Sequence, residues 1–192
     1  GVNQIAIDGN VQQSNPSATG AEPAKPQFAL DVAQLGGMYA GKIFIVGTEA
    51  GLGVRNAGTI TATSGHLTLT ADGQLSNSGV IASNGAAADL SLATKGVDNS
   101  GTLGSQRDIV VNDGGAGVSN AGTVQAARQL LLQSGQLSNL DSGSMTAQRL
   151  DIAATGLSNA GSITQTGLQD LSIHSATLSN TGSTAVLGAP PA

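Results

Sequence analysis

The sequence has no cysteine and no tryptophan, and only 10% of its residues are charged. Without cysteine, neither a disulfide framework nor a thiolate metal site is possible. The net charge of −5 provides no basic face, so nucleic acid is not an expected partner. No apolar run is long enough for a transmembrane helix. No signal peptide is visible either, so we expect the chain to be an internal piece of a larger protein.

Proline and aromatic residues are scarce and confined to particular regions. All five prolines lie outside residues 27–189, where a proline would remove a hydrogen bond between strands. The two phenylalanines and one tyrosine, at Phe28, Phe44 and Tyr39, all come before residue 54. This distribution favours a continuous sheet with a narrow interior that aliphatic side chains fill.

A short motif recurs along the chain from residue 54 onward. Its first copy is residues 54–60, Val-Arg-Asn-Ala-Gly-Thr-Ile, and its asparagines follow one another at steps of 21, 22, 21, 19, 20 and 21 residues. Such a regular period indicates a repeat architecture. The asparagines are Asn56, Asn77, Asn99, Asn120, Asn139, Asn159 and Asn180.

Pairs of aliphatic residues, two positions apart, lie between the asparagine motifs. Examples are Leu67 with Leu69 and Leu90 with Leu92. This spacing puts both side chains on one face of a strand. Strands this short need stacked neighbours to bury a face. We therefore predict an all-β fold, a parallel β-helix with three short strands per rung of about 20 residues, right-handed by the crossover rule. A leucine-rich repeat has a similar period, but no repeat here has room for an amphipathic helix.

Two interpretations of the repeated asparagine are open. In a stacked coil, each asparagine amide can donate to the carbonyl of the equivalent residue one rung away, which satisfies polar groups inside the coil. Alternatively, Asn-x-Gly is an exposed turn, because asparagine readily enters turn conformations. We favour the buried ladder. The glycine two residues later permits either a positive φ or a close approach of two backbones.

The chain divides into three regions by pattern. We predict irregular β-helix rungs over residues 1–53, with a looped-out segment at 12–27 that is rich in proline, alanine and serine. Residues 54–187 are predicted to form the regular array. Residues 188–192 are predicted to be a frayed tail.

Three segments before and at the first repeat carry a family resemblance: Phe28–Val32, Leu35–Ile43 and Gly47–Gly58. They resemble the block that precedes the haemagglutinin-type repeats in filamentous-haemagglutinin-like exoproteins of Gram-negative two-partner secretion systems. That family includes adhesins and contact-dependent growth inhibition toxins. The resemblance covers about residues 27–187, is specific in the block and is looser in the repeats.

The resemblance implies a secreted, cell-surface rod that projects a receptor-binding or toxin region away from the cell. It also implies an outer-membrane secretion partner and a receptor on a host cell or on another bacterium. The family's amino-terminal secretion signatures are not matched, since Asn15-Pro16-Ser17 lies in a linker, and no carboxy-terminal toxin module is visible. The parent is therefore either an adhesin or a growth-inhibition toxin.

We predict no catalytic, cofactor-binding or metal-binding residues. His66 and His174 are separated by about five rungs and cannot share a metal. Asp89 and Asp108 lie on neighbouring rungs, where a carboxylate pair could serve a retaining glycosidase or bind a cation, but two solvated corner residues are the simpler interpretation. Residues 114–117 resemble the opening of a calcium-binding repeat without its aspartate ligand or a tandem copy, so we interpret them as a long corner.

Arg107, Arg128 and Arg149 are spaced 21 residues apart. In a coil they are expected to stack along one corner, near Asp108 and Gln129. Such a row could contact an acidic glycan or another anion. A solvated corner is the plainer interpretation.

Three functional hypotheses follow. In the first, the chain is a non-catalytic structural rod segment. In the second, its corners bind glycans or a receptor directly. In the third, it is a polysaccharide-active enzyme, which would need a cleft with carboxylates and aromatic residues. The unpaired strand edges at the two ends of such a coil also predict some end-to-end self-association.

Overall fold

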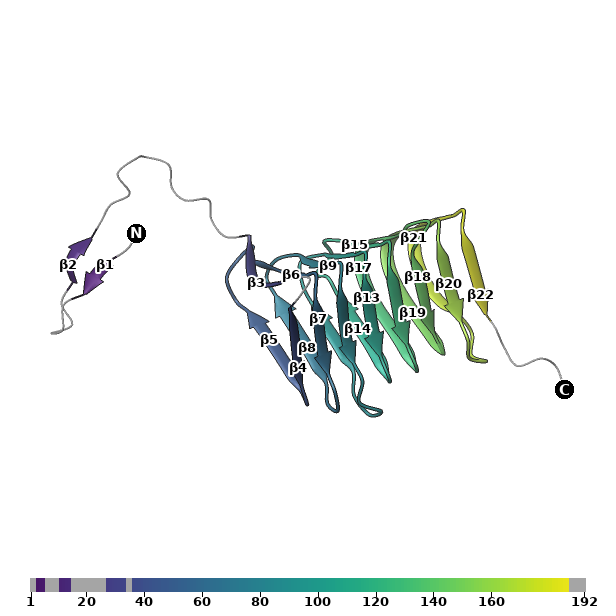
Figure 1. The fold of residues 1–192 in the computed structure, drawn as a ribbon. Coiled ribbons are helices and arrows are strands. Elements are labelled where there is room, and N and C mark those ends of the chain that lie inside the picture. Colours follow the sequence, from purple (N-terminus) through teal and green to yellow (C-terminus); the bar gives the residue numbers. More distant parts are fainter. Residues whose placement is uncertain (1–2, 6–10, 15–26, 34–35, 187–192) are drawn as a thin grey trace.

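The computed structural model describes residues 3–5, 11–14, 27–33 and 36–186. Every regular element in these residues is a β-strand, and they contain no helix. Apart from the first two strands, all strands pair in parallel and stack into a coil (Figure 1). The predicted all-β parallel β-helix is confirmed. Its handedness stays a prediction.

One side of the coil is an eight-stranded parallel sheet. Inward and outward residues alternate along these strands, as a period of two requires, and β7, for example, buries Ile60 and Ala62. The strands are β4 (Gly37–Ala40), β7 (Thr59–Ala62), β10 (Val80–Ser83), β13 (Thr102–Ser105), β16 (Thr123–Ala126), β18 (Ser144–Ala147), β20 (Ser162–Gln165) and β22 (Ser183–Val186).

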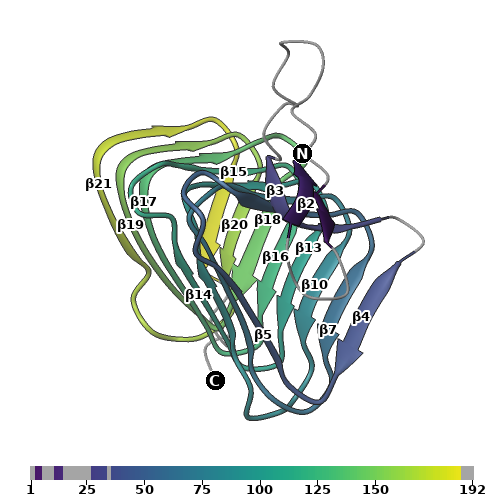
Figure 2. The ribbon, with the colours of Figure 1, turned by 90° about the vertical axis from the view of Figure 1, so that its left-hand side faces the viewer.

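A second sheet supplies the other two sides. One of these sides carries the repeated asparagine and consists of β3 (Phe28–Val32), β6 (Gly53–Asn56), β9 (Leu75–Asn77), β12 (Val97–Asn99) and β15 (Val118–Asn120). The other carries the aliphatic pairs and consists of β5 (Ile43–Gly47), β8 (Leu67–Ala71), β11 (Leu90–Ala93) and β14 (Asp108–Asn112). Seen from the side of the first rung, successive rungs lie one behind another around a shared interior (Figure 2).

The two sides of the second sheet merge toward the C-terminal end. There β17 (Gln129–Asn139), β19 (Arg149–Asn159) and β21 (Ser172–Asn180) each run along both sides. Earlier rungs have a break at this corner; Gly96, for example, adopts a φ of 102°. Gly135 and Gly156 have no positive φ, so the backbone stays extended and pairing continues. Three short strands per rung therefore describe the earlier rungs, while later rungs share long strands.

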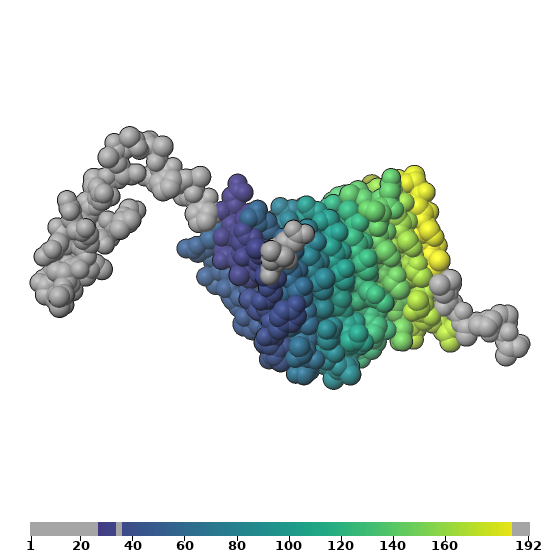
Figure 3. Space-filling model, viewed as in Figure 1, coloured from purple at the N-terminus to yellow at the C-terminus, as the bar shows by residue number. Residues whose placement is uncertain are grey.

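The interior consists of columns of aliphatic residues in register. Leu67 pairs with Leu90, Leu90 with Ile109, Ile109 with Leu130, and Leu130 with Leu150, and all five are fully buried. Each rung therefore packs against the rungs before and after it, and the space-filling view shows the rungs as successive coloured layers (Figure 3). Stacking of equivalent residues thus builds one hydrophobic core that is continuous along the coil.

The strands β3, β4 and β5 form the first rung of the same coil. Val32 pairs with Asn56, and Ile43 pairs with Leu67. The rungs expected before residue 54 thus include one that is in register with the regular array. The domain boundary at residue 53 stays a prediction.

The first two strands form a pair of their own. β1 (Asn3–Ile5) and β2 (Val11–Ser14) are antiparallel and belong to neither of the parallel sheets. This differs from the irregular rung expected over residues 1–11, because a short alternating segment can pair with a segment only a few residues away. Most of the loop expected at 12–27 and the whole tail expected at 188–192 lie outside the described residues.

The columns predict a large difference between inward and outward truncation. Ile109→Ala removes a fully buried side chain that packs against Leu90 and Leu130, so we expect a loss of about 2–5 kcal/mol. Val110→Ala, at the neighbouring outward position, is the matched control and should cost well under half as much. Thermal and urea unfolding monitored by circular dichroism would measure both. Equal losses would contradict the assignment of the inward face.

Candidate functional site

The seven repeated asparagines form a continuous chain of hydrogen bonds inside the coil. Asn56 Nδ2 donates to Asn77 Oδ1 at 2.8 Å, and Asn77 Nδ2 donates to Asn99 Oδ1 at 2.8 Å. The same bond links 99 to 120, 120 to 139, 139 to 159 and 159 to 180 at 2.7–2.8 Å. The first six residues of this Asn ladder are at most 1% exposed, whereas Asn180, in the last rung, is exposed.

Five of the amides, those of Asn56, Asn77, Asn99, Asn139 and Asn159, also donate to the backbone of the next rung. Asn56 Nδ2 lies 3.1 Å from the carbonyl oxygen of Val80, and Asn77 Nδ2 lies 3.1 Å from that of Thr102. Each of these carbonyls lies three residues after the next asparagine along the chain, at the first residue of a strand of the eight-stranded sheet. The Asn ladder therefore satisfies the backbone at a corner as well as itself.

The glycine of the Asn-x-Gly motif allows the backbones of two neighbouring rungs to approach each other closely. The glycines with positive φ do not include those of the Asn-x-Gly motif. A Cβ built on Gly79 would overlap the carbonyl oxygen of Gly58, and one on Gly101 would overlap that of Gly79. Backbone hydrogen bonds at this corner hold the two rungs close together; Ser78 N, for example, donates to Asn56 O at 2.8 Å. Of the two roles open from the sequence, the structure therefore supports close approach.

The arginines of the predicted row are largely engaged with carboxylates. Arg107 Nε and Nη2 each lie 2.5 Å from an oxygen of Asp89. Arg128 pairs in the same two-point manner with Asp108, with 2.7 Å between Arg128 Nε and Asp108 Oδ1. The hydrogen bonds from Arg128 hold the pKa of Asp108 below its ordinary value of 3.8. In the other pair, the hydrogen bond to Asp89 raises the pKa of Arg107.

Arg149 does not continue this pattern. It pairs in register with Gln129, which itself pairs with Asp108, so a neutral amide occupies the position at which Arg128 finds its carboxylate. Arg149 is exposed and has no ion pair within the described residues. Backbone hydrogen bonds link the three arginines along the corner, from Arg128 N to Arg107 O and from Arg149 N to Arg128 O at 2.8 Å each, but only the first two guanidinium groups pair with a carboxylate.

The other candidate residues do not assemble a reactive site. His66 Nδ1 accepts a hydrogen bond from the backbone N–H of Asp89 at 3.0 Å, and His174 is exposed on a distant rung. Asp89 and Asp108 are each held by an arginine rather than aimed at a shared cleft. The described part of the chain holds no group of three or more His, Asp or Glu residues arranged for a metal.

Asp113 is a structural residue that sequence reasoning missed. It is fully buried, and its Oδ1 and Oδ2 accept hydrogen bonds from the N–H groups of Gly115 and Gly117 at 2.7 Å each. Ser134 Oγ on the next rung donates to Oδ2 at 2.5 Å. A carboxylate surrounded by donors stabilises the long corner at residues 114–117 rather than binding a cation. An aspartate directly before a glycine run was the available signal, since such residues close turns.

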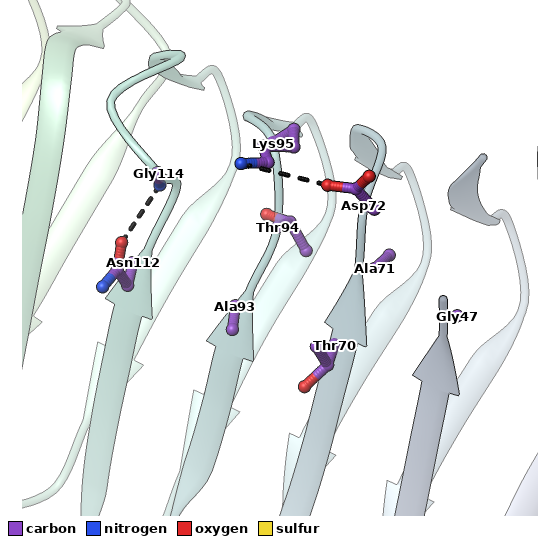
Figure 4. Close-up of a pocket in the computed structure, with 9 residues that line it drawn as sticks. All are labelled: Gly47, Thr70, Ala71, Asp72, Ala93, Thr94, Lys95, Asn112 and Gly114. Atoms are coloured by element: carbon purple, nitrogen blue, oxygen red, sulfur yellow. Dashed lines mark hydrogen bonds and ion pairs between the residues drawn. The ribbon is translucent and has the colours of Figure 1, made fainter. Parts of the chain in front are cut away.

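A shallow hollow of about 280 Å³ lies beside this corner (Figure 4). Lys95 and Asp72 face each other across its rim at 3.9 Å, and Asn112 Oδ1 accepts from Gly114 N at 3.0 Å. Small residues such as Ala93 also line it. The polar groups bond to one another and do not converge on a common point.

These features define a class: a parallel β-solenoid segment whose polar residues chiefly hold its own rungs together. The described residues include no helix able to span a membrane. No protein-family model matches the chain, and no solved structure matches it significantly.

Curated relatives are found among CdiA proteins. The chain is 48% identical over 98 residues to Toxin CdiA of Yersinia pestis, which is 50% of this chain and 3% of the relative. It is 49% identical over 79 residues to tRNA nuclease CdiA-2 of Burkholderia pseudomallei, or 41% of this chain and 2% of the relative. It is 38% identical over 119 residues to tRNA nuclease CdiA of Escherichia coli strain NC101, or 59% of this chain and 3% of the relative. The predicted resemblance to contact-dependent growth inhibition toxins is therefore confirmed. The chain spans only a few per cent of these relatives.

The Asn ladder predicts coupled effects of substitution. Asn99→Ala leaves Asn77 Nδ2 without its side-chain acceptor and Asn120 Oδ1 without its donor, so we expect a loss of about 1–3 kcal/mol. Asn120→Ala should cost a similar amount. Because the two residues share one bond, the double variant should cost less than the sum of the single losses. Thermal unfolding would measure all three, and silent single variants would contradict a buried ladder.

The Arg128–Asp108 pair predicts a dependence of stability on pH. Because the folded-state pKa of Asp108 is lowered, its stabilising contribution is present above pH 3.8 and is lost as the pH falls through the lowered value. Asp108→Asn should therefore lower stability at pH 7 by at most about 1 kcal/mol, since Arg128 is largely exposed. The difference from the parent chain should vanish in strong acid. The control is Asp98→Asn at an exposed position that has no ion pair within the described residues, and melting curves between pH 2 and 7 would measure both variants.

Proposed function

We propose that this chain is a non-catalytic structural rod segment of a large secreted exoprotein on the surface of a Gram-negative bacterium. The observation that carries the proposal is the Asn ladder with its flanking columns, which repeats one set of inward contacts from rung to rung. Each added rung lengthens such a coil by about 4.8 Å. An array of many rungs places the region at its tip far from the cell.

The relatives support a role shared by proteins with different activities. Their names include tRNA nuclease and 16S rRNA endonuclease, yet they share this type of segment with the chain. Nucleases that act on different RNAs have different catalytic requirements. A β-solenoid segment that they share is therefore better explained by a common role in delivery than by a role in catalysis. The segment accordingly carries an adhesive or toxin-delivering region without contributing catalysis.

The parent protein is proposed to leave the cell through an outer-membrane secretion partner and to meet a receptor on a host cell or another bacterium. Within this chain the arginine corner is a weak candidate for that receptor contact, because Arg107 and Arg128 are neutralised by their own carboxylates. The exposed last strands, β21 and β22, support end-to-end self-association of the isolated chain.

Removal of one whole rung tests the rod. Deleting residues 97–117 joins Gly96 to Val118, which already occupies the position of Val97 one rung later. We expect a folded chain, shorter by about 4.8 Å in small-angle X-ray scattering, with its sheet content retained. Deleting residues 97–106 alone breaks the register and should abolish the cooperative fold. If the whole-rung deletion is as damaging as the partial one, the rungs are not equivalent building units.

The competing binding function is tested separately. The triple variant Arg107→Ala, Arg128→Ala and Arg149→Ala removes every arginine of the corner. If the segment is a rod, neither the parent chain nor this variant should bind a glycan array or bacterial cells. Binding by the parent chain that the triple variant loses would favour an adhesive module instead.

A further inference from the structure

One asparagine outside the Asn ladder differs from the ladder residues in both its neighbour and its environment. Asn84 is the only asparagine of the chain that is followed directly by glycine. It is exposed at the corner between β10 and β11, where it lines a hollow of about 160 Å³ together with Thr102, Gln106 and Gln125. Asn99, by contrast, is fully buried and bonded within the Asn ladder. Water therefore reaches Asn84 but not Asn99.

The packing of this corner explains why glycine follows Asn84. A Cβ built on Gly85 would lie 2.3 Å from the carbonyl oxygen of Ser64 in the preceding rung, so a side chain has no space there. Asn84 N donates to Ala62 O at 2.8 Å, and Ala88 N donates to Gly85 O at 2.9 Å. Gly85 N, between these two bonds, donates no backbone hydrogen bond within the described residues. No backbone hydrogen bond is therefore lost when this nitrogen turns toward the side chain of Asn84.

These conditions favour an attack of the backbone on the asparagine side chain. The amide nitrogen that follows an asparagine can bond to Cγ of that side chain and close a five-membered ring. Glycine obstructs this approach least, because it has no Cβ and adopts more backbone conformations than other residues. In the Asn ladder, burial and hydrogen bonds on both sides of each amide hold the two groups apart.

We propose that Asn84 is a site of spontaneous deamidation and isoaspartate formation in the folded chain. Gly85 N bonds to Cγ of Asn84 while the Cγ–Nδ2 bond breaks, and the proton of Gly85 N passes through water to the departing nitrogen, which leaves as ammonia. Water then opens the succinimide ring. Cleavage between nitrogen and Cγ gives aspartate, and cleavage between nitrogen and the backbone carbonyl carbon gives isoaspartate. One water is consumed, one ammonia is released, and nothing is oxidised or reduced.

The two products should affect the corner differently. In isoaspartate the main chain runs through the side chain, so it is one carbon longer between the nitrogen of residue 84 and that of Gly85. The first nitrogen is held by Ala62 O, and Gly85 lies tightly against Ser64, so the added carbon displaces one of these contacts. Aspartate leaves the backbone unchanged, and the other residues that line the hollow are uncharged. Isoaspartate therefore loosens the corner, whereas aspartate does not.

Ageing of the whole chain tests the site. The folded protein is kept for weeks in mildly alkaline buffer and then digested, and fragment mass spectra locate each asparagine at which OH has replaced NH2. We expect conversion at Asn84 to be roughly tenfold or more faster than at Asn99, whose reaction requires local unfolding of its rung. Enzymatic methylation of isoaspartate should report the second product at residue 84.

The matched control is Asn84→Gln. Glutamine already occupies the equivalent corner of the next rung, where Gln106 N donates to Ser83 O as Asn84 N donates to Ala62 O. The longer side chain would have to close a six-membered ring, which forms far more slowly, so this variant should form no isoaspartate at residue 84.

Thermal unfolding separates the effects of the two products. Freshly prepared Asn84→Asp carries the charge of aspartate without the added backbone carbon and should melt like the parent chain. Aged parent chain should instead develop a fraction that melts at a lower temperature, and aged Asn84→Gln should not. Circular dichroism measures all of these samples.

Two results would overturn the proposal. One is an Asn84 that stays intact in the folded chain but converts in the chain unfolded by urea, because the fold then protects it. The other is aged protein that contains isoaspartate at residue 84 and still melts like fresh protein. Neither result bears on the proposed rod function, which the deletion of a whole rung tests separately.

Discussion

A side-chain amide inside a narrow coil must find partners for its hydrogen atoms and its carbonyl oxygen, and here the asparagines find them in one another. Each hydrogen bond contributes about 1 kcal/mol net to stability, whereas a buried amide group left without its partner costs more. The asparagines therefore restrict which register the chain can adopt more than they add to its stability. A slip of one residue would turn every asparagine outward and leave the backbone at the corner unpaired. The Asn ladder thus fixes the register in which the aliphatic columns can stack.

Other features of the repeat follow from that register. The rung after an asparagine approaches so closely that Gly79 and Gly101 have no space for a side chain. Corners elsewhere have more freedom, because they face solvent and tolerate added residues. At residues 114–117 the extra length is closed by Asp113, which uses backbone N–H groups of its own loop. The corner after Asn139 is also longer, yet Asn139 Nδ2 still donates to Gly143 O at 3.2 Å, so the Asn ladder tolerates added residues directly after it.

Sequence periodicity was sufficient for the fold class and for the positions of the inward columns, since both depend on spacing along one chain. It placed Leu67 and Leu90 in neighbouring rungs, where the structure pairs them. It could not show that Arg149 sits against Gln129, because that depends on how a shorter rung closes its corner. Nor could it show the unpaired Asn56 Oδ1, which results from a valine in a rung outside the repeat pattern. Such features depend on the local backbone path at one corner or in one rung, and the repeat period does not determine that path.

A coil whose rungs all present the same interface has no intrinsic length. Any rung can receive another that carries an asparagine at the ladder position. Charge does not set this match, because charged residues are sparse and the ion pairs between neighbouring rungs lie on the outside of the coil. Polarity at the inward position does, since a buried carbonyl oxygen facing a valine has no alternative partner. At Val32 this inward match fails, and Arg55 and Asp31 join the first two rungs from outside instead.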